Sequence, residues 1–415
     1  MEPVSVAVLG CGNRGQYYAS YSKLHPEQLR IAGCADSSEI KRKKMSGEYT
    51  LPENAVFISA EELLSQPRFA DAVFICTQDR EHVEHAVAAL EKGYHLLLEK
   101  PVSPSVSECK RLTEVARRYK KEVVVCHVLR YAPFYQTLKQ LIDSGELGEI
   151  VHINSSEHIG YWHFSHSFVR GNWRNSNESS PLILAKCCHD IDTLLWLAGK
   201  PCRTVSSQGG LYWFNEKNAP DGSAKRCLDG CKVKDSCVYD VEKLYSIGFC
   251  GEGSFLLSAL TQDITEKGIK DALAVSPYGR CVYYCDNNVA DHQQVTIETE
   301  GGATIGFSVC AFSQECYRSI HIMGTKGEAV GSVNKNKLEL IRYGREPETI
   351  CLDAEESGSG HGGGDMLMIK HFIDLVRGKG GGSPALLEQS LTSHYVAFAA
   401  EESRQKGGIP IRLSD

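Results

Sequence analysis

Short apolar runs alternate with helical patterns over the first third of the chain. The apolar runs lie at Val4 to Leu9, Leu29 to Ala35, Ala70 to Cys76, His95 to Leu98 and Glu122 to Val128. Segments with a helical pattern of apolar residues lie between them. Runs of this kind are typical of parallel strands buried on both faces. Their alternation with helices indicates a doubly wound α/β sheet. We therefore predict a first α/β domain over residues 1–128.

The turn after the first run is rich in glycine and reads Gly10-Cys11-Gly12-Asn13-Arg14-Gly15. Between a strand and a helix, Gly10 allows a tight turn, Gly12 lets the backbone approach a pyrophosphate, and Gly15 lets helix and strand pack closely. The N-terminus of the following helix attracts phosphate groups. This context predicts a Rossmann domain that binds a dinucleotide.

An acidic residue, Asp36, ends the second predicted strand. A carboxylate at this position is the expected partner of a ribose 2′-hydroxyl, which favours NAD. The basic run Lys41 to Lys44 would instead suit a 2′-phosphate, so NADP is the less favoured cofactor. A solvated helix face is the simpler interpretation of that run.

Strand patterns dominate the rest of the chain. They lie at residues 149–155, 295–299, 303–310, 319–324, 328–333 and 337–343. We predict a second α/β domain over residues 129–385 with a large open, mainly antiparallel sheet. A helix from Asp365 to Arg377, with Asp365 as its N-cap, follows the strands. A last helix begins at Leu386, and residues 386–415 are expected to return toward the first domain.

Composition limits the kind of partner. Hydrophobic residues make up 42% of the chain and charged residues 23%, as in ordinary globular proteins. The net charge of −7 is not the excess of positive charge that binding to nucleic acid or an anionic membrane requires. A small-molecule partner is therefore expected, and the start of the chain does not read as a signal peptide, which favours the cytoplasm.

A lysine, Lys100, follows the fourth strand within the sequence Glu99-Lys100-Pro101. Ligands of doubly wound sheets bind beyond the carboxyl ends of the strands. An ammonium group there can donate to a substrate hydroxyl and stabilise developing alkoxide charge. A salt bridge to Glu99 is the alternative.

The stretch from Leu182 to Leu197 is strongly apolar and carries charged groups, which are costly to bury unless they pair or line a cleft. Helical spacing would place Lys186, His189 and Asp192 on neighbouring turns. We expect His189 to act as general base, Asp192 to hold its far nitrogen, and Lys186 to aid the substrate oxygen.

An aromatic segment at residues 158–174 mixes rings with hydrogen-bonding groups, as a sugar site requires. Core or interface packing is the alternative. Together with neighbours expected at the cleft, the candidate substrate-binding residues are Arg130, Tyr131, Tyr161, His163, His166, Trp173 and His361.

The glycine motif, Asp36, the Glu-Lys-Pro sequence and His189-Asp190-Ile191-Asp192 together resemble the glucose-fructose oxidoreductase / inositol dehydrogenase / MocA (Gfo/Idh/MocA) family. The resemblance implies a nicotinamide cofactor, redox chemistry at ring carbons of sugars or cyclic polyols, and subunit contacts through the second sheet. It implies that Lys100 faces nicotinamide and substrate before a cis proline bond. Thr77, His82 and Glu99 then match positions near the cofactor. The family usually has aspartate where this chain has Ala185, which weakens any transfer of a Lys/Asp/His relay.

Three functions remain open. The first is an NAD-dependent oxidoreductase acting on a sugar, glycoside or cyclic polyol. The second is a glycosidase that uses NAD transiently, through oxidation, elimination, water addition and re-reduction. The third is a non-catalytic NAD-binding regulator, which the presence of Lys100 and His189 argues against.

Cysteines cluster in an insertion around residues 220–290. Thiolates can form a closed tetrahedral zinc site, and the candidate ligands are Cys227, Cys231, Cys237 and Cys281. The alternative is a group of reduced, buried thiols.

Overall fold

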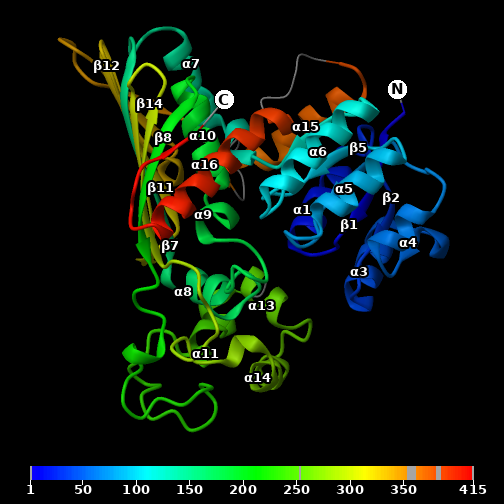
Figure 1. Ribbon diagram of the computed structural model, residues 1–415. Coiled ribbons are helices and arrows are strands. Elements are labelled where there is room, and N and C mark those ends of the chain that lie inside the picture. The colour runs from blue at the N-terminus through cyan, green and yellow to red at the C-terminus, as the bar shows by residue number, and fades with distance from the viewer. Residues whose placement is uncertain (1, 252–253, 353–360, 380–384, 414–415) are drawn as a thin grey trace.

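The computed structural model describes residues 2–251, 254–352, 361–379 and 385–413. Its first domain is a six-stranded parallel sheet with the strand order β3-β2-β1-β4-β5-β6 (Figure 1). The strands are β1 Val4–Leu9, β2 Leu29–Ala35, β3 Val56–Phe57, β4 Ala72–Ile75, β5 His95–Leu98 and β6 Val123–Val125. This order defines the Rossmann fold, so the predicted fold is confirmed.

Helices flank this sheet, and their starts follow local sequence rules. The helices of the first domain are α1 Asn13–Ala19, α2 Tyr21–Leu24, α3 Glu39–Tyr49, α4 Ala60–Ser65, α5 His82–Glu91 and α6 Val106–Tyr119. Serine side chains at Ser38, Ser59 and Ser105 cap α3, α4 and α6 by accepting hydrogen bonds from backbone N–H groups of the first turn.

The second domain contains a nine-stranded sheet with the order β14-β13-β12-β11-β7-β10-β9-β8-β15. Its strands are β7 Ile150–Gly160, β8 Cys202–Gly210, β9 His292–Thr299, β10 Thr304–Ser313, β11 Tyr317–Gly324, β12 Gly327–Ser332, β13 Lys337–Arg342, β14 Glu348–Cys351 and β15 Ile411–Arg412. Among its described strands, only β7 and β10 pair in parallel. The expected open, mainly antiparallel sheet is therefore confirmed.

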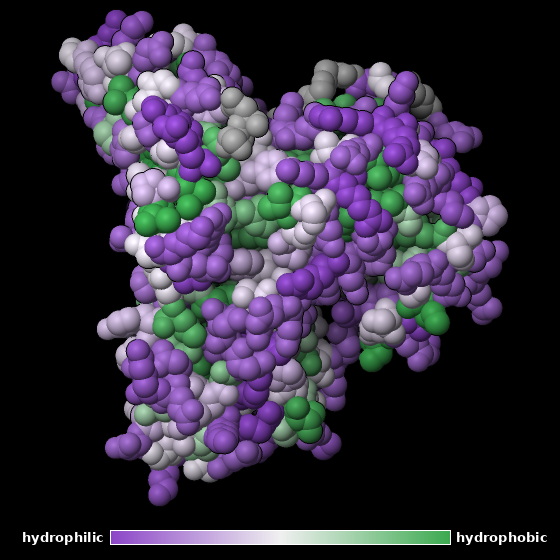
Figure 2. All heavy atoms as spheres, in the orientation of Figure 1, coloured by the Kyte–Doolittle hydropathy of each residue, from purple (hydrophilic) through white to green (hydrophobic). Residues whose placement is uncertain are grey.

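Helices cover one face of this sheet. They are α7 Pro133–Asp143, α8 Tyr161–Phe164, α9 Leu182–Ala185, α10 Cys188–Ala198 and α16 Leu387–Gln405. In β7, Ile153 and Ile159 point into the core, whereas His152 and Ser156 are only partly buried on the other face. Figure 1 shows that face without covering helices. Figure 2 shows a mainly hydrophilic surface in the same orientation, with smaller hydrophobic patches.

The two domains are joined by the C-terminal helices. Met368 and Phe372 of α15 (Gly364–Val376) pack in the Rossmann core, although the sequence assigned this stretch to the second domain. Leu391 of α16 also packs against the first domain, whereas Val396 packs in the core of the second. Strand β15 then extends the second sheet. The C-terminal segment thus contacts both domains; residues 380–384 and 414–415 lie outside the described part.

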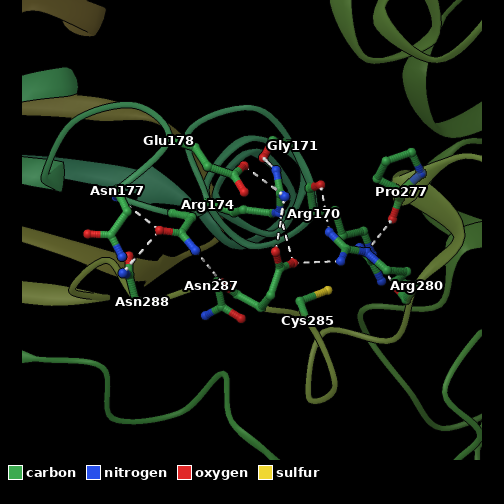
Figure 3. A network of polar contacts seen from close by, with 12 residues as sticks. Arg170, Gly171, Arg174, Asn177, Glu178, Pro277, Arg280, Cys285, Asn287 and Asn288 are labelled. Atoms are coloured by element: carbon green, nitrogen blue, oxygen red, sulfur yellow. Dashed lines mark hydrogen bonds and ion pairs between the residues drawn. The ribbon is translucent and has the colours of Figure 1, made fainter. Parts of the chain in front are cut away.

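The insertion between β8 and β9 has its own small core around Tyr245, Leu257 and Leu273. Its helices are α11 Val241–Leu244, α12 Ile247–Cys250, α13 Phe255–Leu260 and α14 Glu266–Val275. It is anchored through Asp286, which accepts hydrogen bonds from Arg174 at 2.8 and 3.0 Å and from Arg280 at 2.6 Å. Figure 3 labels the two arginines. Within the described residues, no helix is both long and apolar enough to cross a membrane.

Candidate active site

The glycine turn has the geometry that its sequence predicts. Gly10 has a φ of +88°, and a Cβ on Gly15 would lie 2.1 Å from the carbonyl oxygen of Gly10. A Cβ on Gly12 would meet no atom within 4 Å, so this residue faces open space. That space suits the close approach of a ligand to the backbone.

A cleft of about 260 Å³ adjoins the turn, and its lining includes Gly10, Gly12, Asp36 and Thr77. The carboxylate of Asp36 accepts 2.8 Å hydrogen bonds from the backbone N–H groups of Cys11 and Ser38. These bonds fix Asp36 at the end of β2, where a carboxylate binds ribose hydroxyls in Rossmann domains. The residues present therefore fit a dinucleotide.

Arg14 lies in a largely buried polar network. Its Nε donates to Glu99 at 2.8 Å, and its Nη2 donates to Tyr18 and to Asp365. Burial opposes ionisation of Glu99, but the charges of Arg14 and Lys100 outweigh it and lower the pKa of this carboxyl group. Arg14 and Glu99 thus brace the turn that carries the cofactor cleft.

Other predicted cofactor residues hold the strand ends together. Nδ1 of His82 lies 2.7 Å from the carbonyl oxygen of Pro101, and its Nε2 lies 3.1 Å from that of Thr77. The Thr77 hydroxyl lies 3.0 Å from Nδ1 of His85. Asn13 reaches outward and accepts a 3.3 Å hydrogen bond from Ser258 of the insertion.

Lys100 extends from the end of β5 into the second domain. Its Nζ donates to the carbonyl oxygen of Ala185 at 2.9 Å. The Lys100–Pro101 peptide bond is cis. Lys100 therefore joins the cofactor side of the molecule to the helices that carry the other candidate catalytic groups.

The predicted helix from Leu182 to Leu197 is in fact broken. Helix α9 ends at Ala185 and α10 begins at Cys188, so Lys186 and His189 are not on consecutive turns of one helix. Nζ of Lys186 instead pairs with Glu157 of β7 at 3.0 Å. To act on a substrate oxygen as expected, Lys186 would have to share its ammonium group with this buried ion pair.

His189 is 1% exposed and lies against Arg318 of β11. Nη2 of Arg318 donates to its Nε2 at 2.8 Å. Because a guanidinium group can only donate, Nε2 turns its lone pair to Arg318 and the ring hydrogen is then on Nδ1, which is buried without a hydrogen-bond partner among the described residues. Nε2 also lies 3.2 Å from the Asp190 carboxylate. Burial, reinforced by the charges of Arg318 and Lys100, lowers the pKa of His189 well below its usual range. The imidazole is therefore neutral and presents an N–H donor.

The expected contact between Asp192 and His189 is not formed. Asp192 is 1% exposed and accepts hydrogen bonds from Arg130 at 2.5 and 2.7 Å. Nδ1 of His127 lies 2.9 Å from the same carboxylate. The expectation was wrong because both partners come from the segment after β6, which packs against α10. Asp192 and Arg130 form a buried ion pair.

The aromatic segment divides into buried and partly exposed residues. His166 is 4% exposed, its Nδ1 lies 2.8 Å from the Tyr245 hydroxyl, and burial lowers its pKa to about 3. Tyr131 is likewise buried. His166 therefore serves as a packing residue beneath the insertion, contrary to its expected place in the substrate site.

Tyr161, His163 and Trp173 remain partly exposed. His163 lies 3.5 Å from the thiol of Cys316, and burial lowers the pKa of this histidine well below its usual range. Nε1 of Trp173 donates to Asp79 at 3.3 Å, just after the end of β4. These side chains stay candidates for substrate contact.

His361 lies beside His189, with ring centroids 5.6 Å apart. Its Nδ1 is 3.1 Å from the Asp365 carboxylate. Asp365 is not the N-cap of α15, which is Gly363. The sequence prediction of that cap was wrong because the Asp365 side chain turns to His361 and Arg14.

The four predicted zinc ligands do not bring three sulfur atoms within 4.8 Å of one another in the structure. In the part of the chain that the structure describes, the one set of three possible ligand atoms within 4.8 Å is His127, Cys188 and His394. Both ring nitrogens of His394 are already bonded, to the backbone of Val102 and of Ser390.

A buried cation stands near the cysteines instead. Arg170 is fully buried, donates to the carbonyl oxygens of Tyr239 and Arg280, and acts electrostatically on the thiols of Cys227, Cys237 and Cys281. Burial raises the pKa of Cys281 to about 11. Reduced thiols, the other interpretation of this cluster, fit these surroundings.

Two charged residues of the site were missed in the sequence, Glu157 and Arg318. They are direct cross-strand neighbours in β7 and β11, and their Oε2 and Nε atoms lie 3.0 Å apart. Each shares its face of the strand with a buried isoleucine two residues further on, Ile159 after Glu157 and Ile320 after Arg318. A charged residue in line with a buried isoleucine of a strand is a signal that could have revealed them.

The fold and this site define a dinucleotide-binding oxidoreductase of two α/β domains. The chain belongs to the Gfo/Idh/MocA oxidoreductase family. The family's NAD-binding Rossmann fold matches residues 4–127, and its C-terminal alpha/beta domain matches residues 139–413.

Individual relatives are distant. The chain is 26% identical to YteT of Bacillus subtilis (strain 168), covering 74% of this chain and 72% of YteT. It is 25% identical to the inositol 2-dehydrogenase of Leifsonia xyli subsp. xyli (strain CTCB07), covering 58% of this chain and 67% of that enzyme. Other curated relatives align over about half of their own length. The WlbA dehydrogenase from Bordetella pertussis, solved in complex with NADH and UDP-GlcNAcA, has a TM-score of 0.70 at 15% identity over 100% of both chains.

Proposed function

We propose that this protein is an NAD-dependent oxidoreductase that transfers hydride to or from a ring carbon of a sugar, glycoside or cyclic polyol. The observation that supports it most directly is the reach of Lys100 from the cofactor strand to Ala185, beside neutral His189. The distant relatives add the substrate class, since one is an inositol 2-dehydrogenase and another was solved with a nucleotide sugar.

Bound NAD supplies the two-electron acceptor or donor for this reaction. Lys100 donates a hydrogen bond to the reacting oxygen and stabilises negative charge that develops on it. His189 adds a second donor through Nδ1, and Arg318 holds its ring in this tautomer. The partly exposed Tyr161, His163 and Trp173 line the side on which a sugar ring binds.

A paired assay tests the function. Purified protein is incubated with NAD and a panel of free polyols and aryl glycosides, while reduced nicotinamide and released aglycone are both measured. Reduced nicotinamide without aglycone is the expected result and identifies the substrate. Aglycone released over many turnovers without net reduced nicotinamide would replace the proposal with a transient-redox glycosidase. Absence of both signals across the panel would contradict the proposal.

Asp36 sets the cofactor preference. The Asp36→Asn variant removes the charge, and its amide cannot accept from Cys11 and Ser38 at the same time. We expect the Kd for NADH to rise at least about tenfold, equivalent to ~1.4 kcal/mol, while the Kd for NADPH changes less. Fluorescence titration of both nucleotides measures the two constants. Equal weakening of both would show that Asp36 acts through the turn rather than through the ribose.

The uncovered face of the second sheet is the proposed contact between identical subunits. Its central strand β7 presents His152, Asn154, Ser156 and His158 there, none of them fully buried. The family resemblance favours this face for a homo-oligomer.

A further inference from the structure

The pair of His361 and Asp365 leaves one imidazole nitrogen able to accept a proton. A carboxylate only accepts hydrogen bonds, so the 3.1 Å contact with Asp365 places the ring hydrogen of His361 on Nδ1. Nε2 then carries a lone pair, and it has no hydrogen-bond partner among the described residues. The side chain of His361 is 26% exposed.

His189 has the opposite polarity. Its Nε2 lone pair accepts from Arg318, which leaves an N–H group on Nδ1. The two rings are nearly perpendicular, at 74°, with centroids 5.6 Å apart. Side by side, one histidine offers a hydrogen-bond donor and the other an acceptor.

The backbone holds His361 in an unusual conformation. Its φ is +43°, a left-handed value that is rare for residues other than glycine. Where such residues do adopt it, they are often found at functional sites. The following glycines permit this path: Gly362 has a φ of +64°, and a Cβ on Gly364 would lie 2.2 Å from the carbonyl oxygen of Val128. The loop is thus packed closely against the segment after β6.

Asp365 is fully buried and remains charged. One of its oxygens faces His361 and the other accepts from Arg14, which also binds Glu99 beside Lys100. Burial opposes ionisation, but His361 and Arg14 outweigh it and lower the pKa of Asp365. A buried anion behind Nδ1 stabilises the imidazolium that forms when Nε2 gains a proton.

We propose that His361, oriented by Asp365, is the catalytic proton acceptor of this enzyme, and that His189 serves as a donor. This inference rests on the proposed oxidation of a ring hydroxyl. The substrate O–H bond breaks, and its proton forms a new bond to Nε2 of His361. The electron pair left on oxygen completes the C=O bond as the hydride leaves the same carbon for the cofactor. In the reverse direction Nε2 returns the proton to the oxygen.

The surroundings of His361 determine the protonation state of its imidazole. Burial lowers the pKa of His361, Asp365 raises it, and the charges of Arg14 and Arg318 lower it again. The neighbouring His189 is neutral. The ring of His361 is therefore unprotonated at neutral pH and able to accept.

The test compares His361→Ala and His361→Asn with wild type on the substrate found in the paired assay. We expect kcat to fall by about 100-fold or more, the Kd for NADH to change less than about twofold, and added imidazole to restore part of the kcat of His361→Ala. His25→Ala serves as the control, because His25 is a surface histidine packed on Tyr21. Its kcat is expected to stay at the wild-type value.

Retention of kcat in both His361 variants would overturn the inference and leave the proposed function intact. Loss of kcat without imidazole rescue, or together with loss of NADH binding, would also overturn it by assigning His361 to packing. His361→Asn guards against misfolding in the smaller variant, since its amide can still donate to Asp365. Failure of wild type on the whole panel would reject the proposed function first, and this inference with it.

Discussion

Replacing Lys100 by methionine is expected to lower kcat by about 100- to 1,000-fold, the usual cost of removing one donor from a developing oxyanion. Methionine keeps a similar length but removes the ammonium group. Nζ lies 2.9 Å from the carbonyl oxygen of Ala185, at the junction of the cofactor strand and the second domain. The measurement is steady-state turnover on the identified substrate, with the Kd for NADH determined in parallel.

A matched control shows whether the effect depends on the position of Lys100 or only on the loss of one positive charge. Lys110→Met changes an exposed lysine in α6 of the same domain and is expected to keep both kcat and the Kd for NADH. If Lys100→Met kept more than about half of the wild-type kcat, Lys100 would have no catalytic role.

The cofactor half of the site was predictable because its determinants are local in sequence. Gly10, Gly12 and Gly15 act within one strand–turn–helix unit, and Asp36 ends the adjacent strand. The steric clash that a Cβ would cause at Gly15 explains why the pattern requires glycine there. The doubly wound character of the first sheet and the mainly antiparallel character of the second likewise followed from the patterns of apolar residues.

The proton-transfer groups were harder to predict because distant contacts choose their partners. The sequence paired Asp192 with His189, but the structure pairs it with Arg130, 62 positions away. Lys186 was misplaced because the helix is broken at residues 186–187, and no proline or glycine marks that break. The carboxylate–histidine pair that the sequence sought exists elsewhere, between Asp365 and His361.

The cysteine cluster shows a similar limit. The spacing of Cys227, Cys231 and Cys237 says that thiols are close in sequence, but not whether their sulfur atoms converge. The buried cation of Arg170 comes from a different segment and disfavours a nearby dication. Only the packing of the insertion on residues 165–178 reveals it.

Replacing Asp192 by asparagine is expected to destabilise the protein by about 3–5 kcal/mol, because it leaves Arg130 as a buried cation without its carboxylate. Burial opposes ionisation of Asp192, but His127 and Arg130 outweigh it and lower its pKa. A lowered folded-state pKa means that this stabilisation is present at neutral pH and is lost as pH falls below about 4. Thermal unfolding followed by circular dichroism from pH 3 to 8 measures the difference, which is expected to shrink at the acid end.

Asp143→Asn is the control for that experiment, because Asp143 forms an exposed ion pair with Lys139 and its loss costs less than about 1 kcal/mol.

The Asp192 variant also distinguishes two assignments of the Asp192 carboxylate. If it orients a catalytic histidine, kcat falls while stability is kept. If it neutralises the buried Arg130, stability falls while the folded fraction keeps most of its kcat. The bidentate contacts at 2.5 and 2.7 Å favour the second result, in line with our proposal that the histidine–carboxylate pair for proton transfer is His361 and Asp365.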